Sequence, residues 1–255
     1  GVPDQESRDP LDGRPWNQQP RREMMDDFFI PVPETVLPCG MVVPAFEVGK
    51  FLCTPDQLTS GADITPDRPP MTMISFHAAL EACFIRGWRM ITETQWLAIA
   101  WDVCRQNENW TGRKYGSGKL LQGVRKGNVN KPISGVCQTP DPDENRWKVL
   151  SNHQKICDFG GNAASWVFDD LQGDIDGTGR TIEMDSPSMT TAPFPRLTAG
   201  MGWRPDDRRE IAGRSLIRGG GWRSGKDAGA FHLWFAPSVC GFLGVGFRAT
   251  RPVQQ

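Results

Sequence analysis

The segment 221–246 mixes charged, imidazole, thiol, aromatic and aliphatic side chains without the period of an amphipathic helix or a half-buried strand. A hydrophobic core is not built from such a mixture. A binding surface is, because aromatic and Arg side chains supply contact area and polar ones supply direction. We therefore predict a ligand-binding surface formed by Arg223, Ser224, Lys226, Asp227, His232, Trp234, Phe235, Ser238, Cys240, Phe242 and Leu243. The alternative is an irregular loop that packs Trp234 and Phe235 into the core.

A second candidate site is a run of oxygen-bearing residues that loosely follows a calcium-binding loop. Asp174, Asp176 and Thr178 hold the first, third and fifth positions, Gly179 the sixth and Asp185 the twelfth. Arg180 and the lack of flanking helical patterns favour an ordinary Asp/Gly turn instead. Calcium at Asp174, Asp176 and Asp185 is thus a secondary expectation, and no other cofactor is predicted.

A third feature is the basic stretch 111–131, which contains six Lys or Arg residues and no acid. Such a stretch binds phosphate in some proteins, but stacking residues for a nucleic acid are limited to Tyr115. Glycines recur through it, so a solvated loop is the favoured interpretation. The basic residues are Arg113, Lys114, Lys119, Arg125, Lys126 and Lys131.

The seven cysteines and three histidines do not form a recognisable metal or catalytic pattern. No pair of cysteines has zinc-finger spacing, and His77 and His153 lie apart from any nucleophile motif. Cys83 and Cys104 lie in apolar helical patterns, where a small buried side chain is expected. Disulfides elsewhere in the chain are left open.

Composition restricts the class of protein. The 255 residues carry 29 basic and 30 acidic side chains, so no overall field attracts nucleic acid, and no apolar run is long enough to span a membrane. The 28 glycines and 21 prolines predict many loops, and 10 tryptophans require that these loops be packed. We expect a polar N-terminal arm over 1–30 and one domain over 31–255.

Local patterns predict two helices and several short strands. Ser75 caps a helix with apolar Phe76, Ala79, Leu80, Cys83 and Phe84, ending near Gly87. A capping box of Thr92 and Gln95 starts a second helix, whose apolar positions are Trp96, Leu97, Ala100, Trp101 and Cys104. Between 31 and 53, short β-favouring pieces cut by Pro predict edge strands.

Four segments, taken in order, resemble homologues of the formylglycine-generating enzyme. They are PAFEVGKFLCT, the stretch from Pro70 to Trp101, FGGNAASWVFD, and SLIRGGGW followed by GVGFRATR. The resemblance covers about 31–251. It implies an α+β C-type lectin fold of the formylglycine-generating-enzyme subtype, with two helices, a small twisted antiparallel sheet and abundant packed loops.

The catalytic residues of that family do not carry over. Its oxidase uses a close pair of thiolates after the Gly-Gly-x-Trp motif, but Cys240 is the single cysteine in the corresponding region here. The Glu that is associated with calcium in the family is replaced by Ser165. The chain is therefore expected not to be an enzyme.

The C-terminal motifs are similar to those of variable proteins of diversity-generating retroelements, which share this fold type. Matching strings are GGGW at 219–222, AGAF at 228–231, APS at 236–238 and GFR at 246–248. The resemblance implies a scaffold of Gly219, Gly220, Trp222, Gly246, Phe247 and Arg248, with a variable region at 221–246.

The resulting prediction is a binding protein with a diversified C-terminal surface. Its partner is expected to be a macromolecule, in particular a protein, with no nucleic acid and no membrane insertion, and oligomers would add avidity. A virion or cell surface is the favoured location, with the cytoplasm as the alternative. Two other functions stay open: a related oxidase that uses Cys240, and an accessory lectin-fold protein without diversification.

Overall fold

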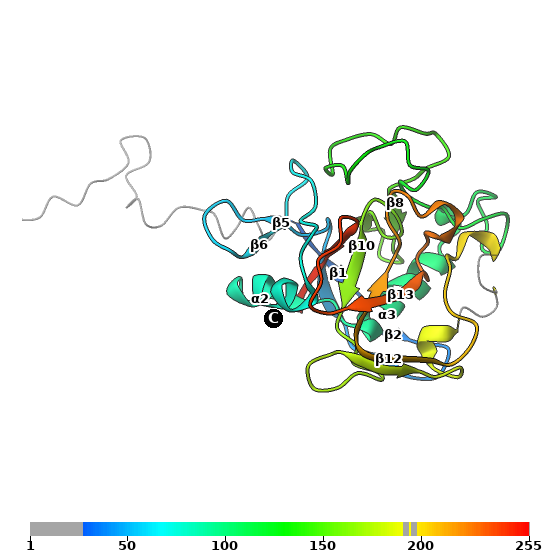
Figure 1. The fold of residues 1–255 in the computed structure, drawn as a ribbon. Coiled ribbons are helices and arrows are strands. Elements are labelled where there is room, and N and C mark those ends of the chain that lie inside the picture. The colour runs from blue at the N-terminus through cyan, green and yellow to red at the C-terminus, as the bar shows by residue number, and fades with distance from the viewer. Residues whose placement is uncertain (1–27, 191–193, 195–197, 255) are drawn as a thin grey trace, which may run out of the picture.

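The computed structural model describes residues 28–190, 194 and 198–254. The predicted arm over 1–30 lies almost wholly outside the described residues, and strand β1 begins at Phe29. Two α-helices, two main sheets and long loops make up the described part (Figure 1). This is the α+β architecture that was predicted for a C-type lectin fold. No helix among the described residues is long and apolar enough to cross a membrane.

Both helices start where their caps predict. Ser75 Oγ accepts a hydrogen bond from Ala78 N (3.2 Å) at the start of α2 (Phe76–Ile85). The capping box of Thr92 and Gln95 is complete at the start of α3 (Glu93–Arg105).

The expected core face of α2 needs one correction. Phe84 is 80% exposed, whereas Phe76, Ala79, Ala82 and Cys83 are buried. Phe84 lies eight positions after Phe76, which turns it about 80° away around the helix. Ala79, Ala82 and Cys83 lie on the opposite side of Phe76 around the helix axis. Phe84 is therefore outside the buried face of the helix.

The first sheet brings the two ends of the domain together. Its strands, in spatial order, are β1 (Phe29–Val32), β4 (Phe46–Gly49), β15 (Ala249–Pro252) and β7 (Arg89–Met90), all antiparallel. β4 pairs on both sides, so the prediction of edge strands was wrong for it. Pro44 and Pro55 lie outside its span, and every β4 residue can therefore donate to the ladder.

The second sheet positions the C-terminal segment. Its strands run β11 (Gly179–Ile182), β12 (Arg209–Arg218), β10 (Ala164–Val167) and β14 (Val245–Phe247), and β13 (Leu233–Pro237) pairs with β12. The β10–β14 pair is parallel, in contrast to the all-antiparallel expectation. Three short ribbons complete the strands: β2 (Thr35–Val36) with β3 (Val42–Val43), β5 (Thr54–Pro55) with β6 (Ala62–Asp63), and β8 (Trp147–Val149) with β9 (Lys155–Cys157).

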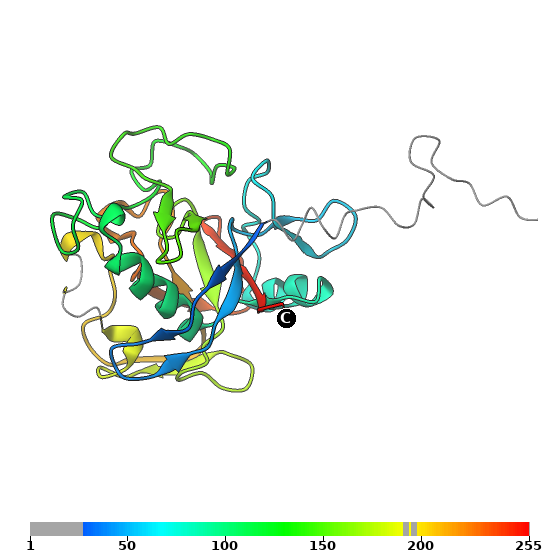
Figure 2. The ribbon, with the colours of Figure 1, turned by 180° about the vertical axis from the view of Figure 1, so that it is seen from behind.

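Helix α3 carries the main core contacts to the C-terminal segment. Figure 2 shows α3 in front of the second sheet. Trp96 stacks on Phe159 with ring centroids 4.2 Å apart, and its Nε1 donates to the carbonyl of Ala230 (2.7 Å). Trp101 packs edge-on against Phe231. The tryptophans of α3 thus bind the loops to the helix, as expected of packed loops.

Candidate binding surface

The candidate surface begins directly after β12, at two glycines with left-handed backbone angles. Gly219 and Gly220 have φ of 88° and 74°, which side-chain-bearing residues rarely adopt. A Cβ at Gly220 would approach Ala228 Cα to 2.9 Å. Trp222 then turns inward, is 4% exposed, and its backbone N donates to Asn162 O (3.0 Å). The chain therefore leaves the sheet at a defined angle.

The other end of the segment is held by strand pairing and by buried side chains. Gly246 lies opposite Ser165 in the parallel β10–β14 pair, and Phe247 is fully buried. Arg248 is also fully buried and donates to the carbonyls of Gly49 (2.6 Å) and Cys157 (2.7 Å). Burial lowers the pKa of Arg248 to about 10. The residues expected to form the scaffold are thus those that fix the ends of the segment.

Between these ends, the first exposed part lies on and around the 3-10 turn η5 (Gly225–Asp227). Arg223 and Lys226 are exposed, and Ser224 and Asp227 are half-buried. The Arg223 guanidinium lies over the Trp222 ring, 5.6 Å from its centroid. Ser224 Oγ accepts a hydrogen bond from Gly221 N (2.9 Å), which closes the turn. Two exposed cations, Arg223 and Lys226, therefore lie on a hydrogen-bonded backbone turn.

Trp234 on β13 forms the aromatic centre of the surface. Its side chain is 46% exposed and stacks on Phe235 at 5.1 Å with an interplanar angle of 10°. Trp203 contacts its ring from another loop, also at 5.1 Å. Arg214 of the neighbouring strand lies 5.5 Å from the Phe235 centroid. A half-exposed indole held between other rings is well ordered, which lowers the entropy cost of binding.

Three predicted contact residues do not face solvent. His232, Phe235 and Ser238 are 9%, 8% and 6% exposed. His232 Nδ1 bonds to Asp227 O (2.7 Å), and burial lowers its pKa to about 4. Phe235 lies beneath the Trp234 ring, and Ser238 O accepts from Phe76 N (3.0 Å). The expectation that these three side chains point outward was wrong. They are buried and pack behind the exposed residues of the surface.

The last part of the segment packs beside the start of α2. Cys240 is exposed, Leu243 is 52% exposed, and Phe242 is half-buried against Trp166. Met73 N donates to Phe242 O (3.0 Å), which joins this loop to the residues before the helix. Apolar side chains gather here, whereas the part around Trp234 combines rings with cations.

Three neighbours of the surface come from outside the segment and were not predicted. Trp203 and Arg214 adjoin the part around Trp234, and Met73, 62% exposed, adjoins the loop with Leu243. Met73 has a φ of 60°, which is strained for a side-chain-bearing residue. Met71 and Ile74, close to it in the sequence, are also hydrophobic, so no local signal marks Met73 as exposed. Only the register of β12 with β13 identifies Arg214.

The calcium candidates do not assemble into a site. The Asp174 carboxylate accepts hydrogen bonds from Asp176 N (3.0 Å), Thr178 N (3.0 Å) and Thr178 Oγ1 (2.8 Å). The Thr178 hydroxyl contributes most to lowering the pKa of Asp174. Asp176 and Asp185 are exposed, and the described part of the chain contains no group of three metal-ligating side chains. The segment is an Asp-stabilised turn, so the calcium expectation is not supported here.

The segment 221–246 contains no pair of thiols. Arg223, Ser224, Lys226 and Asp227 occupy the turn at which the resemblance implied them. Cys240 is exposed and unbonded to another cysteine, and Ser165 is fully buried within β10.

Comparison with known proteins finds overall similarity without close relatives. No family model matches the chain. No curated protein matches it either. Among solved structures, a Major Tropism Determinant I1 variant is 12% identical with a TM-score of 0.42, covering 88% of this chain and 55% of the other. This chain therefore spans about half the length of that protein.

Two further solved structures match over most of their length. PvdO from Pseudomonas aeruginosa is 14% identical with a TM-score of 0.44, covering 88% of this chain and 92% of the other. Treponema denticola variable protein 1 is 14% identical with a TM-score of 0.38, covering 82% and 85%. At such identities no function transfers, so the function is argued from this chain's own surface.

Proposed function

We propose that the chain is a non-enzymatic binding protein that presents a diversified C-terminal surface to a macromolecular target, most simply another protein. The observation that carries the proposal is the division of the segment 221–246. Its ends are held by buried residues, whereas Arg223, Lys226, Trp234, Cys240 and Leu243 are exposed. Such a surface can change its specificity without unfolding the domain.

The chemistry of the exposed residues favours a protein target. Trp and Arg are the residue types that dominate protein–protein binding energy, and Trp234 lies beside Trp203 with Arg214 close by. Nucleic acid is disfavoured because acidic and basic side chains balance over the chain. We place the protein on a virion or cell surface, where a target is met directly, and oligomers would raise avidity.

Sequencing the coding locus across a population of the source tests the diversification. Substitutions are expected at the codons of the exposed residues, directed to adenines, together with a nearby near-repeat of the segment. Codons for Gly219, Gly220 and Trp222 should be constant. An invariant segment without a near-repeat would overturn diversification and leave an accessory lectin-fold protein.

A metal titration separates the binding role from the oxidase. The purified protein is titrated with Cu(I) and compared with Cys240→Ala. Weak binding that is equal in both proteins is expected, because one thiol cannot form a two-thiolate site. Tight stoichiometric binding that disappears in the variant would establish the oxidase alternative and contradict the proposal.

A further inference from the structure

A groove lies between helix α3, the turn of the β2–β3 ribbon and the 3-10 turn η3 (Pro187–Met189). It consists of two adjoining pockets, a first of about 310 Å³ and a second of about 430 Å³, and Pro38 and Trp101 line both of them. Leu97, Trp101 and Arg105 are spaced four residues apart, so one face of α3 lines the groove along its length. The helix rises about 12 Å over these residues, which is the length of about four residues of an extended chain.

Apolar side chains form most of the groove, and each pocket holds one charged residue. In the second pocket, Val36 is 57% exposed and Tyr115 is 39% exposed. Asp185 lines the first pocket and Arg105 the second, and both are exposed without an ion-pair partner in the described part of the chain. Apolar surface that stays open to solvent beside unpaired charges is typical of a binding site for another polypeptide segment.

Residues 1–27, which lie outside the described part, contain a segment of matching chemistry. Asp12, Arg14 and Trp16 place an acid, a base and an indole at alternate positions. Trp16 is the only aromatic residue before Phe28. An indole gains more than most side chains from an apolar pocket, because it buries a large area. Pro15 restricts the backbone beside it, which lowers the entropy cost of binding.

The length of the chain allows this segment to reach the groove of its own molecule. Leu37, a wall residue of the first pocket, follows Phe28 by nine residues, so the two Cα atoms are at most about 32 Å apart. Trp16 precedes Phe28 by twelve residues, and that stretch spans up to about 40 Å. The covalent connection also keeps the segment at a high effective concentration near the groove, so a modest intrinsic affinity is sufficient.

We propose that the segment 12–16 binds in this groove of its own chain, with the Trp16 indole in the first pocket between Leu97 and Pro187. The bound segment removes apolar surface of the groove from water, which is favourable. The other occupants that such a groove accepts are the same segment of a second copy and an extended segment of another protein. The proposal does not involve the surface around Trp234, so the two proposals fail separately.

The charges of the groove set the direction of the bound segment. With Trp16 in the first pocket, Arg14 lies two residues away and pairs with Asp185, and Asp12 extends toward Arg105 in the second pocket. The reverse direction would bring Asp12 beside Asp185, where two carboxylates repel each other. Opposite charges thus meet in one direction and like charges in the other.

The reaction rate of Cys39 reports whether the groove is covered. Cys39 is an exposed thiol that lines the first pocket, whereas the exposed thiols of Cys137 and Cys240 line neither pocket and serve as internal controls. The full chain is reacted with a maleimide for graded times, and the modification of each cysteine is quantified by peptide mass spectrometry. Transient release of the segment lets Cys39 react in the parent too, so the rate changes and the final number of modified thiols does not.

The variant Trp16→Ala should expose the groove. Cys39 is expected to react about fivefold faster or more, because the main apolar contact of the segment is lost. The rates at Cys137 and Cys240 should stay unchanged. Equal rates at Cys39 in the parent and the variant, or equal acceleration of all three thiols, would overturn the proposal.

Charge reversal tests the direction and the origin of the segment. Arg14→Glu should accelerate Cys39 by about two- to fivefold, and the addition of Asp185→Arg should restore the slow rate, since opposite charges meet again. Arg21→Glu reverses a charge of the arm outside the segment and is the matched control without effect. Failure of the double variant to restore the rate would overturn the pairing. Rates independent of protein concentration are expected, and a rate that falls as the concentration rises would show that a second copy donates the segment, contrary to the proposal.

Discussion

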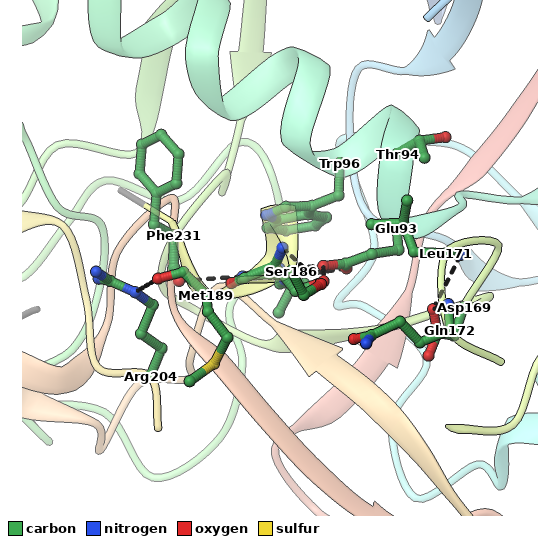
Figure 3. Close-up of polar contacts among 12 residues, drawn as sticks. Glu93, Thr94, Trp96, Asp169, Leu171, Gln172, Ser186, Met189, Arg204 and Phe231 are labelled. Carbon is green, nitrogen blue, oxygen red and sulfur yellow. Dashed lines mark hydrogen bonds and ion pairs between the residues drawn. The ribbon is translucent and has the colours of Figure 1, made fainter. Parts of the chain in front are cut away.

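Glu93 and Arg218 form an ion pair whose side chains are both fully buried. Arg218 Nε donates to Glu93 Oε2 (2.9 Å), and Arg218 Nη2 contacts Oε1. Ser188 Oγ donates to the same carboxylate (2.6 Å), and Arg218 Nη1 donates to Phe231 O (3.1 Å). Figure 3 shows Glu93 at the start of α3 and Phe231 on a separate segment of the chain. The pair thus ties the helix and β12 to the backbone that leads into β13.

Removing one partner of this pair should strongly destabilise the domain. Arg218→Met leaves the Glu93 carboxylate buried with one remaining side-chain donor, Ser188, so the free energy of unfolding should fall by about 3–5 kcal/mol. Urea denaturation at neutral pH measures it. Arg208→Gln is the matched control, because Arg208 pairs with Glu183 in solvent and should change stability by about 1 kcal/mol or less. Equal losses in the two variants would contradict the structural role of the buried pair.

The helix caps could be predicted from sequence, but this pair could not. The caps of Ser75 and Thr92 depend on residues within one turn, and local spacing therefore identified them. Glu93 at a helix start reads as an exposed acid that complements the helix dipole. Its partner lies 125 residues away, and no local pattern connects the two.

The pH dependence of stability should contain two opposing contributions. Burial lowers the pKa of His232 to about 4, so between about pH 4 and 6.5 the unfolded chain binds the extra proton and stability rises with pH. Burial, with a smaller contribution from the Glu93 charge, raises the pKa of Asp169 to about 6. The folded chain therefore holds the extra proton between about pH 3.8 and 6. The contribution of Asp169 to the free energy of unfolding consequently falls as the pH rises through this window.

Two variants should separate these contributions. In Asp169→Asn an amide oxygen still accepts from Leu171 N and Gln172 N, so stability should rise more steeply from pH 4 to 6.5 than in the parent. In His232→Gln the rising contribution is lost. Each contribution amounts to about 3 kcal/mol across its window. Unfolding free energies measured at intervals from pH 4 to 7 should diverge, and parallel curves for both variants and the parent would disprove the assignment.

The cysteines should fall into two classes by accessibility. Cys39, Cys137 and Cys240 are exposed free thiols, and the other four are buried. Burial raises the pKa of Cys104 to about 12, so that thiol is also protonated at neutral pH. A native Ellman titration should report three thiols, two in Cys240→Ala, and seven after denaturation of the parent. Five in denaturant would instead reveal a disulfide.

The position of the candidate segment was predictable from sequence, but the direction of its side chains was not. Its ends followed from the resemblance of the GGGW and GFR strings to motifs of a known family. Trp234 and Phe235 are chemically similar neighbours, yet they are 46% and 8% exposed. In the pairing of β13 with β12, Trp234 lies opposite Ile217 and Phe235 opposite Leu216, and both of these partners are buried, so no local pattern tells which of the two rings is covered. That register depends on residues far apart in sequence.

Trp234 and Phe235 should therefore respond differently to truncation. Trp234→Ala should weaken binding to the isolated target by 2 kcal/mol or more, about 30-fold, because an ordered indole is lost from the surface. Its stability should change by about 1 kcal/mol, since contacts to Trp203 and Phe235 are replaced by solvent. Phe235→Ala should instead cost about 3–5 kcal/mol of stability.

Affinity chromatography with the parent domain, using Trp234→Ala as the comparison bait, isolates the target for this measurement. Titration calorimetry then gives affinities, and urea denaturation gives stabilities for the same proteins. Phe235→Leu serves as the control for Phe235→Ala, because it retains apolar volume beneath the indole and should preserve most of the affinity and stability. Equal affinity of Trp234→Ala and the parent would show that the target does not contact the aromatic part of the surface. Together with unchanged affinity in Arg214→Ala, it would remove the part of the surface around Trp234 from the proposed binding site.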